Sequence, residues 1–413
     1  MTVWFHRGEA SGLGTMHNQQ DQWEGSGTGA RAASVKRAAQ LERDGHCPKA
    51  ADDQQVAPRP RAHGQLSLSG HETVSSPSSA CSSAPDLANA IFVSIPAYRD
   101  AECQWTMKDA FEKAAQPDLV RFGVAWQLHP EEDEEFVRIA GARSRWKMQV
   151  RDVRVPYTEA TGPCRARALA QALWHGEGYH LQIDAHTRFV QDWDVKLRQE
   201  LHDAESMASF GKAVISTYPC AYEGEGPAAQ ISEDGHATLL CADRFDHEGM
   251  LRLRSRTLSR RPSEGRPIPS RFWAAGFSFS RSKLLQNVPY DPNLPFLFFG
   301  EELAMLARLW TSGWDVFAPT QPILFHQWER KRKTIWTDGV HNSALKLQSQ
   351  NRVMAMLIDG SHYPDANPAG SCHGLGDCRP LSSLWEACGI DLRQKRISER
   401  ALWGGLQRDA FLD

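Results

Sequence analysis

The sequence has no long apolar run, and this absence limits where the chain can reside. No stretch approaches the roughly 18 consecutive apolar residues of a membrane-spanning helix. The first 30 residues hold no apolar signal core, and no Asn-x-Ser/Thr glycosylation acceptor occurs anywhere in the chain. We therefore expect a protein with no membrane span, outside the secretory route and located in the cytoplasm.

The chain also lacks a charge of predominant sign and a paired set of cysteines. Its 47 basic and 50 acidic side chains give a formal net charge of −3, which excludes a general polyanion binder whose whole surface attracts nucleic acid. The 9 cysteines are odd in number and scattered, a pattern that indicates reduced thiols rather than a disulfide framework. No nucleic-acid partner is expected.

Composition divides the 413 residues into three parts. Residues 1–88 are rich in Ser, Gly, Gln and Ala and offer too little apolar surface to offset the chain entropy lost on folding, so they are predicted to be a disordered, low-complexity tail. Residues 89–345 carry the motifs that follow and are predicted to form the main domain. Residues 346–413 are expected to be an extension packed on that domain.

Apolar strand-like runs alternate with helical segments from residue 90 onward. Short runs rich in β-branched and aromatic residues indicate buried strands that begin at Ala90, Leu119, Met148 and Tyr179. Apolar residues at helical spacing predict helices over 105–115, 131–142 and 164–175. The alternation predicts an α/β fold in which helices cover both faces of a mostly parallel sheet. Ligands bind at the carboxyl ends of the strands in such sheets, so the loops that follow the strands are the expected site of chemistry.

The segment after the fourth strand-like run carries the main chemical signal. The apolar stretch YHLQI at 179–183 is followed by Asp184, and His186 lies two residues further on. Alternate residues of an extended backbone point the same way, so a carboxylate and an imidazole would face one point, a set that suits Mn²⁺ or another divalent first-row ion. Spacing alone favours a turn-capping aspartate and a surface histidine, because short Asp-x-His matches are common by chance.

Three further segments change that balance, although each also has an ordinary structural explanation. The stretch GPCRAR at 162–167 opens a helix, where backbone N–H groups, Arg165 and Arg167 would suit a phosphate, or would be a plain helix start with solvated arginines. Glu301 and Glu302 could hold sugar hydroxyls or act as a base, or could be acids that a helix dipole favours. His326, at the end of an apolar run, is by itself more often structural.

Taken in order along the chain, these stretches resemble one family. The matching motifs are IFVSIPAYRD (91–100), GPCRAR (162–167), LWHGE (173–177), YHLQIDAHTRF (179–189), STYP (216–219), WAAGFSFS (273–280), VPYDP (288–292), LFFGEE (297–302), LWTSGWDVFAP (309–319), FHQW (325–328) and GLGD (374–377). Each is weak alone, and the ordered set is specific. Over roughly 90–391 the chain is similar to the cytoplasmic-type N-acetylglucosaminyltransferases, typified by hydroxyproline-directed enzymes.

The resemblance implies a GT-A fold, a Rossmann-like sheet that binds a nucleotide-sugar, with UDP-N-acetylglucosamine as the first choice of UDP-sugar donor. Asp184 and His186 fall on the family's variant of the metal-binding Asp-x-Asp motif. His326 would be the third metal ligand. The expected cofactor is a divalent metal, Mn²⁺ first and Mg²⁺ as the alternative.

The resemblance also assigns a donor site. The residues that would bind the nucleotide and its diphosphate are Ser94, Tyr98, Arg99, Arg165 and Arg167. Three more, Gly276, Glu301 and Glu302, would lie beside the donor sugar, and the two glutamates are the candidate catalytic residues.

The implied activity is a metal-dependent transfer of N-acetylglucosamine from UDP to a hydroxyl acceptor, with retention of configuration. Two mechanisms stay open. One is a front-face route that needs no protein nucleophile, and the other is a sugar cation that a glutamate stabilises. The acceptor stays open between protein hydroxyproline, serine, threonine, another sugar and a small molecule. The alternative is a catalytically inactive module on the same fold that binds a nucleotide-sugar or a carbohydrate, and the intact metal set favours the enzyme.

Overall fold

The computed structural model describes most of the chain after residue 85. The described ranges are 86–140, 144–232, 235–260, 265–329, 333–361 and 373–412. The tail predicted for 1–88 therefore lies outside the described residues except for 86–88, where the chain forms a turn. All elements below belong to the compact unit that spans Ser75–Asp413.

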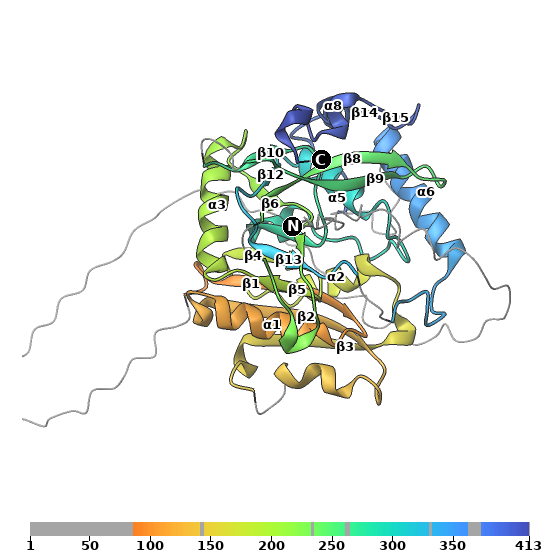
Figure 1. The fold of residues 1–413 in the computed structure, drawn as a ribbon. Helices are drawn as coiled ribbons and strands as arrows, with labels where there is room; N and C mark the ends of the chain where they lie inside the picture. The colour runs from red at the N-terminus through yellow and green to blue at the C-terminus, as the bar shows by residue number, and fades with distance from the viewer. Residues whose placement is uncertain are drawn as a thin grey trace, which may run out of the picture. The chain divides into compact units, whose positions relative to one another are not determined.

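An eight-stranded sheet forms the centre of this unit (Figure 1). Its strand order is β10-β12-β6-β11-β4-β1-β2-β3. The strands are β1 (Ile91–Tyr98), β2 (Val120–Leu128), β3 (Val150–Pro156), β4 (Tyr179–Ile183), β6 (Ala213–Ser216), β10 (Ile268–Ser270), β11 (Phe277–Arg281) and β12 (Asp315–Ala318). The pairings give β1, β2, β3, β4, β6 and β12 one direction, while β11 and β10 run antiparallel to their neighbours. The predicted α/β fold with a mostly parallel sheet is confirmed.

Helices pack on both faces of the sheet, as the alternating pattern predicts. They are α1 (Glu102–Lys113), α2 (Pro163–Gln171), α3 (Trp193–Met207), α4 (Lys283–Asn287), α5 (Glu301–Thr311), α6 (Ser343–Asp359), α7 (Leu381–Cys388) and α8 (Glu399–Leu402). Successive residues of β6 show the two layers: Ala213 and Ile215 belong to the same buried hydrophobic cluster as α1 and α3, whereas Val214 belongs to the cluster that includes residues of α5, α6 and α7. Among the described residues, no helix combines the length and the apolar character that crossing a bilayer requires.

The C-terminal elements share a hydrophobic core with the main sheet. Met356 and Leu357 of α6 and Leu384 of α7 are buried in the same cluster as Leu303 and Leu306 of α5. The domain boundary expected at residue 345 falls inside α6, which begins at Ser343.

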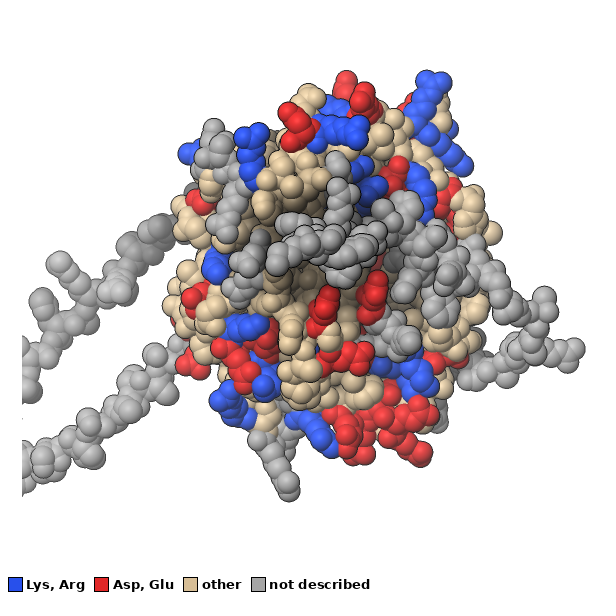
Figure 2. Space-filling view, in the orientation of Figure 1, with Lys and Arg blue, Asp and Glu red and all other residues tan. Residues whose placement is uncertain are grey.

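One predicted helix differs from the structure. Residues 131–142 were expected to be α-helical; 141 and 142 lie outside the described residues, and the described part forms a short 3₁₀ segment, η4, over Glu134–Ala140. The side chain of Asp133 explains the late start, because its carboxylate accepts the N–H of His129 at 2.8 Å and closes a turn before the helix can begin. In Figure 2, acidic side chains gather over this segment, where Glu131, Glu132, Glu134 and Glu135 are exposed.

A second, three-stranded sheet lies beside the carboxyl end of β4. It consists of β5 (Thr187–Phe189), β13 (Leu324–His326) and β7 (Cys220–Ala221), with β13 in the centre. The remaining strands form two hairpins, β8 (Thr238–Phe245) with β9 (Leu251–Thr257), and β14 (Ile390–Asp391) with β15 (Arg396–Ile397). The small sheet matters most for function, because β13 ends at the candidate site residue His326 and β5 begins directly after His186.

Candidate functional site

The three predicted metal ligands lie close together, because the end of β4 lies beside the paired strands β5 and β13. Asp184 follows β4, His186 precedes β5, and His326 ends β13. Strands β13 and β5 pair antiparallel, with His326 opposite Thr187. The Nε2 atoms of His186 and His326 lie 2.9 Å apart, and His326 Nε2 lies 3.3 Å from Asp184 Oδ2. Two segments 140 residues apart in the sequence thus meet at one point.

The geometry of these three side chains fits a divalent cation. One ligand atom from each residue lies within 4.8 Å of the other two. Two ligand atoms bound at right angles about 2.1 Å from one ion would be roughly 3.0 Å apart, close to the spacing of the two Nε2 atoms. Two imidazoles and one carboxylate form a mixed nitrogen and oxygen donor set that suits a first-row divalent ion. The residues present therefore fit the metal that the sequence predicts.

Arg167 links the metal ligands to the glutamates of α5. Its Nη2 donates to Asp184 Oδ1 at 2.7 Å, and its Nε donates to Glu301 Oε1 at 2.8 Å. The side chain is buried, and Nη1 has no hydrogen-bond partner among the described residues. Although burial opposes ionisation, Arg167 and the two histidines hold the pKa of the Asp184 carboxyl well below its usual range. Asp184 is therefore ready to bind a cation as a carboxylate.

Glu301 faces this group from the first turn of α5. The helix is preceded by Gly300, whose φ of 107° is accessible to glycine without strain. Besides the bond from Arg167, Glu301 Oε1 accepts a hydrogen bond from the Tyr290 hydroxyl at 2.8 Å. Gln182, two residues before Asp184 on β4, donates to the same hydroxyl at 3.1 Å. Burial raises the pKa of the Glu301 carboxyl.

Glu302 makes a different set of contacts. Its Oε1 accepts the backbone N–H of Ala275 at 2.9 Å, and its Oε2 accepts the Tyr218 hydroxyl at 2.5 Å. Burial raises the pKa of this carboxyl to about 7. Glu302 thus fixes the segment before β11, where a Cβ atom added to Gly276 would lie 2.8 Å from Asp184 Oδ2. The glycine lets the backbone of this segment approach the metal ligand.

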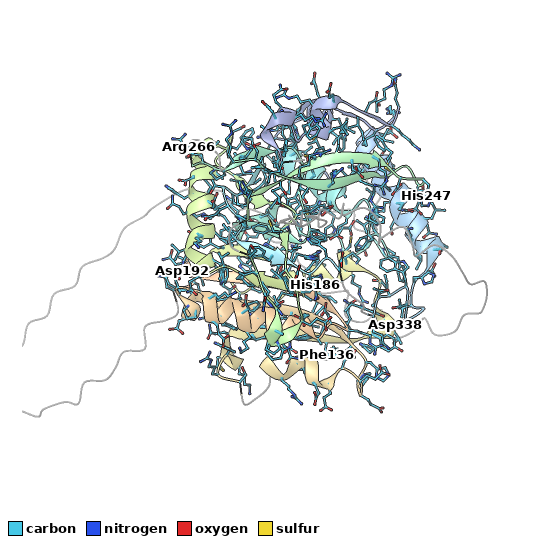
Figure 3. All side chains as sticks on the ribbon, viewed as in Figure 1. Phe136, His186, Asp192, His247, Arg266 and Asp338 are labelled. Atoms are coloured by element: carbon cyan, nitrogen blue, oxygen red, sulfur yellow. The ribbon has the colours of Figure 1, made fainter. Side chains whose placement is uncertain are left out.

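Tyr98 and Arg99 belong to a separate cluster of charges after β1. Arg99 Nε donates to Asp133 Oδ2 at 2.9 Å, and Nη1 donates to Asp338 Oδ2 at 3.1 Å. Arg99 is also paired with Glu132, and the Tyr98 hydroxyl donates to Asp338 Oδ2 at 3.0 Å. Figure 3 shows Asp338 farther toward the edge of the unit than His186, which lies near its centre. The predicted nucleotide contacts of these two residues stay a prediction.

Ser94 and Arg165 make no contact with the metal ligands or the glutamates. Ser94 is buried in the middle of β1, where its Oγ lies 2.9 Å from Nε2 of His180. Burial lowers the pKa of His180 to about 3, so this imidazole is neutral. Arg165 is half-buried and donates to the backbone oxygen of Glu159 at 2.9 Å. Of the two arginines predicted in α2, the structure places Arg167 at the metal ligands.

Several residues at the site were not among those predicted from the sequence. Tyr218 and Tyr290 donate to the glutamates, Gln182 donates to the Tyr290 hydroxyl, and Asp100 Oδ2 lies 2.9 Å from His186 Nδ1. Gln182 and Asp100 could have been found, because one shares a strand face with Asp184 and the other follows a strand of the same parallel sheet. The two tyrosines lie in loops, within the STYP and VPYDP motifs of the resemblance, and no periodic pattern assigns them a role at the site.

The fold is a mostly parallel α/β domain with a candidate cation site at the end of a strand, and comparison with family models shows the class of protein to which it belongs. A model described as Glycosyltransferase (GlcNAc) matches residues 90–140 and 129–394. This match takes in well over half of the sequence, and the chain belongs to this family. The resemblance found in the sequence is thereby confirmed, and the mostly parallel sheet is the architecture expected of the family's GT-A fold. The match also extends into the segment after residue 345.

Solved structures give more distant similarities. GalNAc-T7, crystallised with UDP, GalNAc and Mn²⁺, is 14% identical with a TM-score of 0.48, over 65% of this chain and 48% of that one. The match thus spans about half the length of the GalNAc-T7 chain. S. aureus TarS 1-349 in complex with UDP-GlcNAc is 10% identical with a TM-score of 0.40, over 65% of this chain and 67% of that one. None of the curated proteins matches the sequence.

Proposed function

We propose that the chain transfers N-acetylglucosamine from UDP to a hydroxyl-bearing acceptor, with a divalent cation held by Asp184, His186 and His326. The observation that carries the proposal is the convergence of these three ligand atoms within 4.8 Å, beside the buried Arg167. Membership of the Glycosyltransferase (GlcNAc) family supports the choice of sugar. Mn²⁺ is the first choice of cation and Mg²⁺ the alternative.

The charges of the site suit a leaving diphosphate. A divalent cation bound there would neutralise the negative charge that develops on the β-phosphate oxygen as the glycosidic bond breaks. Arg167 keeps Asp184 ionised, and its Nη1 is a buried donor for a phosphate oxygen at the same point. Since the arginine is already held by two carboxylates, it needs no reorganisation when the donor binds.

Glu301 and Glu302 have different roles in this proposal. Both oxygens of Glu302 accept hydrogen bonds from the protein, from Ala275 and Tyr218, so Glu302 acts by positioning. Among the described residues, Glu301 receives its two side-chain hydrogen bonds on Oε1, which leaves Oε2 for a hydroxyl of the donor sugar. Of the pair, Glu301 is thus the residue assigned to contact the substrate.

The transfer itself exchanges one bond at the anomeric carbon for another. The bond from this carbon to the β-phosphate oxygen breaks and its electron pair leaves with UDP, while the acceptor oxygen forms the new bond and its proton passes to the leaving phosphate. When both events take place on one face of the sugar, configuration is retained and no protein nucleophile is needed. Arg167 and Tyr290 both donate to Glu301, which weakens it as a nucleophile and favours this front-face route.

A panel of UDP-sugars with Mn²⁺, Mg²⁺ or a chelator tests the proposal through the release of UDP. UDP-N-acetylglucosamine with Mn²⁺ should be turned over fastest, and Asp184→Asn should lower the rate on the order of 100-fold or more. Asp192→Asn is the matched control, because this exposed aspartate precedes α3 and asparagine tolerates its φ of 58°. Binding of UDP without turnover of any donor would instead identify an inactive binding module.

A further inference from the structure

Asp100 lies behind His186, on the side of the ring that faces away from the other two metal ligands. Its Oδ2 is 2.9 Å from His186 Nδ1, while His186 Nε2 faces His326 Nε2 at 2.9 Å. Both Asp100 and His186 are 5% exposed. An ionised carboxylate only accepts hydrogen bonds, so the pair places the ring hydrogen on Nδ1 and leaves the lone pair of Nε2 directed into the site.

The carboxylate is fixed by helix α1. Asp100 Oδ1 accepts the N–H of Glu102, the first residue of the helix, at 2.9 Å. Four residues further along, Thr106 donates to the backbone oxygen of Ala185 at 2.8 Å and accepts the N–H of Thr187 at 2.9 Å. Helix α1 thus holds the backbone on both sides of His186, and Asp100 holds the ring.

We propose that Asp100 is a positioning residue that sets the tautomer and the direction of His186 for a divalent cation. This inference rests on the proposed metal site and deepens it. A carboxylate that accepts from the second nitrogen of a ligating histidine fixes its orientation and raises its basicity, and loss of such a partner costs about 10- to 100-fold in metal affinity.

Calorimetric titration of Mn²⁺ into the full chain measures the first consequence. Asp100→Asn should bind Mn²⁺ about 10- to 100-fold more weakly than the parent, because an amide can donate to Nδ1 and move the ring hydrogen to Nε2. Asp109→Asn is the matched control: Asp109 lies on the same helix and accepts the N–H of Phe189 on β5 at 2.8 Å, without touching His186. Equal affinities for the parent and Asp100→Asn would overturn the proposal.

A double-mutant cycle separates positioning from general damage to the fold. In a His186→Ala background, Asp100→Asn should change the remaining Mn²⁺ affinity by less than about twofold, because the ring on which it acts is gone. A loss as large as that in the parent background would contradict the role assigned to Asp100.

Nitrogen NMR of metal-free chain with ¹⁵N-labelled histidine gives a readout that needs no cation. The parent should show His186 protonated at Nδ1, and Asp100→Asn should shift the signals toward the other tautomer. Identical His186 signals in the two proteins would overturn the proposal. A parent that binds no Mn²⁺ would overturn the proposed function, and the tautomer signals would still decide what Asp100 does.

Discussion

Substitution of Gly276 by alanine tests whether the backbone before β11 must approach the metal ligands closely. In Gly276→Ala the added Cβ would lie 2.8 Å from Asp184 Oδ2, so the carboxylate or the backbone of residue 276 must shift and the arrangement of the three ligands is disturbed. We expect Mn²⁺ affinity to fall about tenfold or more, in line with the loss of a group that orients a ligand. Gly235→Ala is the control, because its Cβ would meet atoms only at 3.5 Å and beyond. Equal effects of the two substitutions on Mn²⁺ titrations would contradict this account.

The buried Glu302 should make stability depend on pH. Its folded-state pKa of about 7 lies above the ordinary 4.5, so its contribution to stability is fully present below about pH 4.5 and is lost as the pH rises through 7. Glutamine does not titrate, so the Glu302→Gln variant lacks this decrease in stability as the pH rises. The free energy of unfolding of the variant relative to the parent should therefore rise by about 2 kcal/mol between pH 5 and pH 8.

Urea denaturation at several pH values measures this difference. Substitution of an exposed glutamate, Glu131→Gln, serves as the control and should show no comparable slope. A variant that follows the parent at every pH would show that Glu302 is not the group responsible.

The metal ligands could be predicted from the sequence, whereas most of their partners could not. Asp184 and His186 stand out because a strand end and a two-residue spacing are both local features. His326 needed the family resemblance, since nothing local shows that its strand pairs with β5. Tyr290 and Tyr218 contact the glutamates through loop packing, and no periodic pattern records such contacts.

Helix α1 acts as the support of the small sheet. Thr106 is fully buried, and its hydroxyl bonds the backbone of Ala185 and Thr187. Thr106→Val keeps the shape and leaves those buried groups without this partner, which should cost about 1–3 kcal/mol in the free energy of unfolding. Mn²⁺ affinity should fall as well, because His186 lies between the two bonded residues.

The control for this variant is Thr337→Val, since Thr337 is exposed and its side chain, within the described part of the chain, forms hydrogen bonds with Thr334 of its own turn. Unfolding curves and Mn²⁺ titrations of the two variants should differ clearly. A Thr106→Val chain with parental stability would mean that α1 does not support β5.

The elements themselves were predictable to different degrees. Strands β1 to β4 begin within two residues of the predicted positions, because buried parallel strands have compact apolar sequences. Strands β5 and β13 have three residues each, too short for any periodicity, so their pairing was not predicted. The 131–142 segment has helical spacing, and the turn closed by Asp133 prevents an α-helix from starting there.

The chain should fold and act without residues 1–74, whereas it should not fold without residues 346–413. The described residues begin at Asp86, and the backbone oxygen of Leu87 accepts the N–H of Gly178 at 2.7 Å, which ties this segment to the start of β4. A chain that begins at Ser75 should keep the parental melting temperature and UDP-sugar turnover. Activity lost with residues 1–74 would instead show that the tail takes part in function.

A chain that ends at Leu345 should fail to fold. It would lose Val353, Met356 and Leu357, which share a core with α5, and with them the support of Glu301. Circular dichroism and the yield of monomeric protein measure the outcome. A truncated chain with a cooperative thermal transition would show that 346–413 is a separable extension.

Binding of UDP with and without a divalent cation tests the central claim most directly. Calorimetric titration of UDP into the full chain should show binding with Mn²⁺ present, and affinity at least about tenfold lower with a chelator or in Asp184→Asn. UDP binding of equal strength in Mn²⁺ and in chelator would contradict the claim that Asp184, His186 and His326 hold a cation that binds the diphosphate.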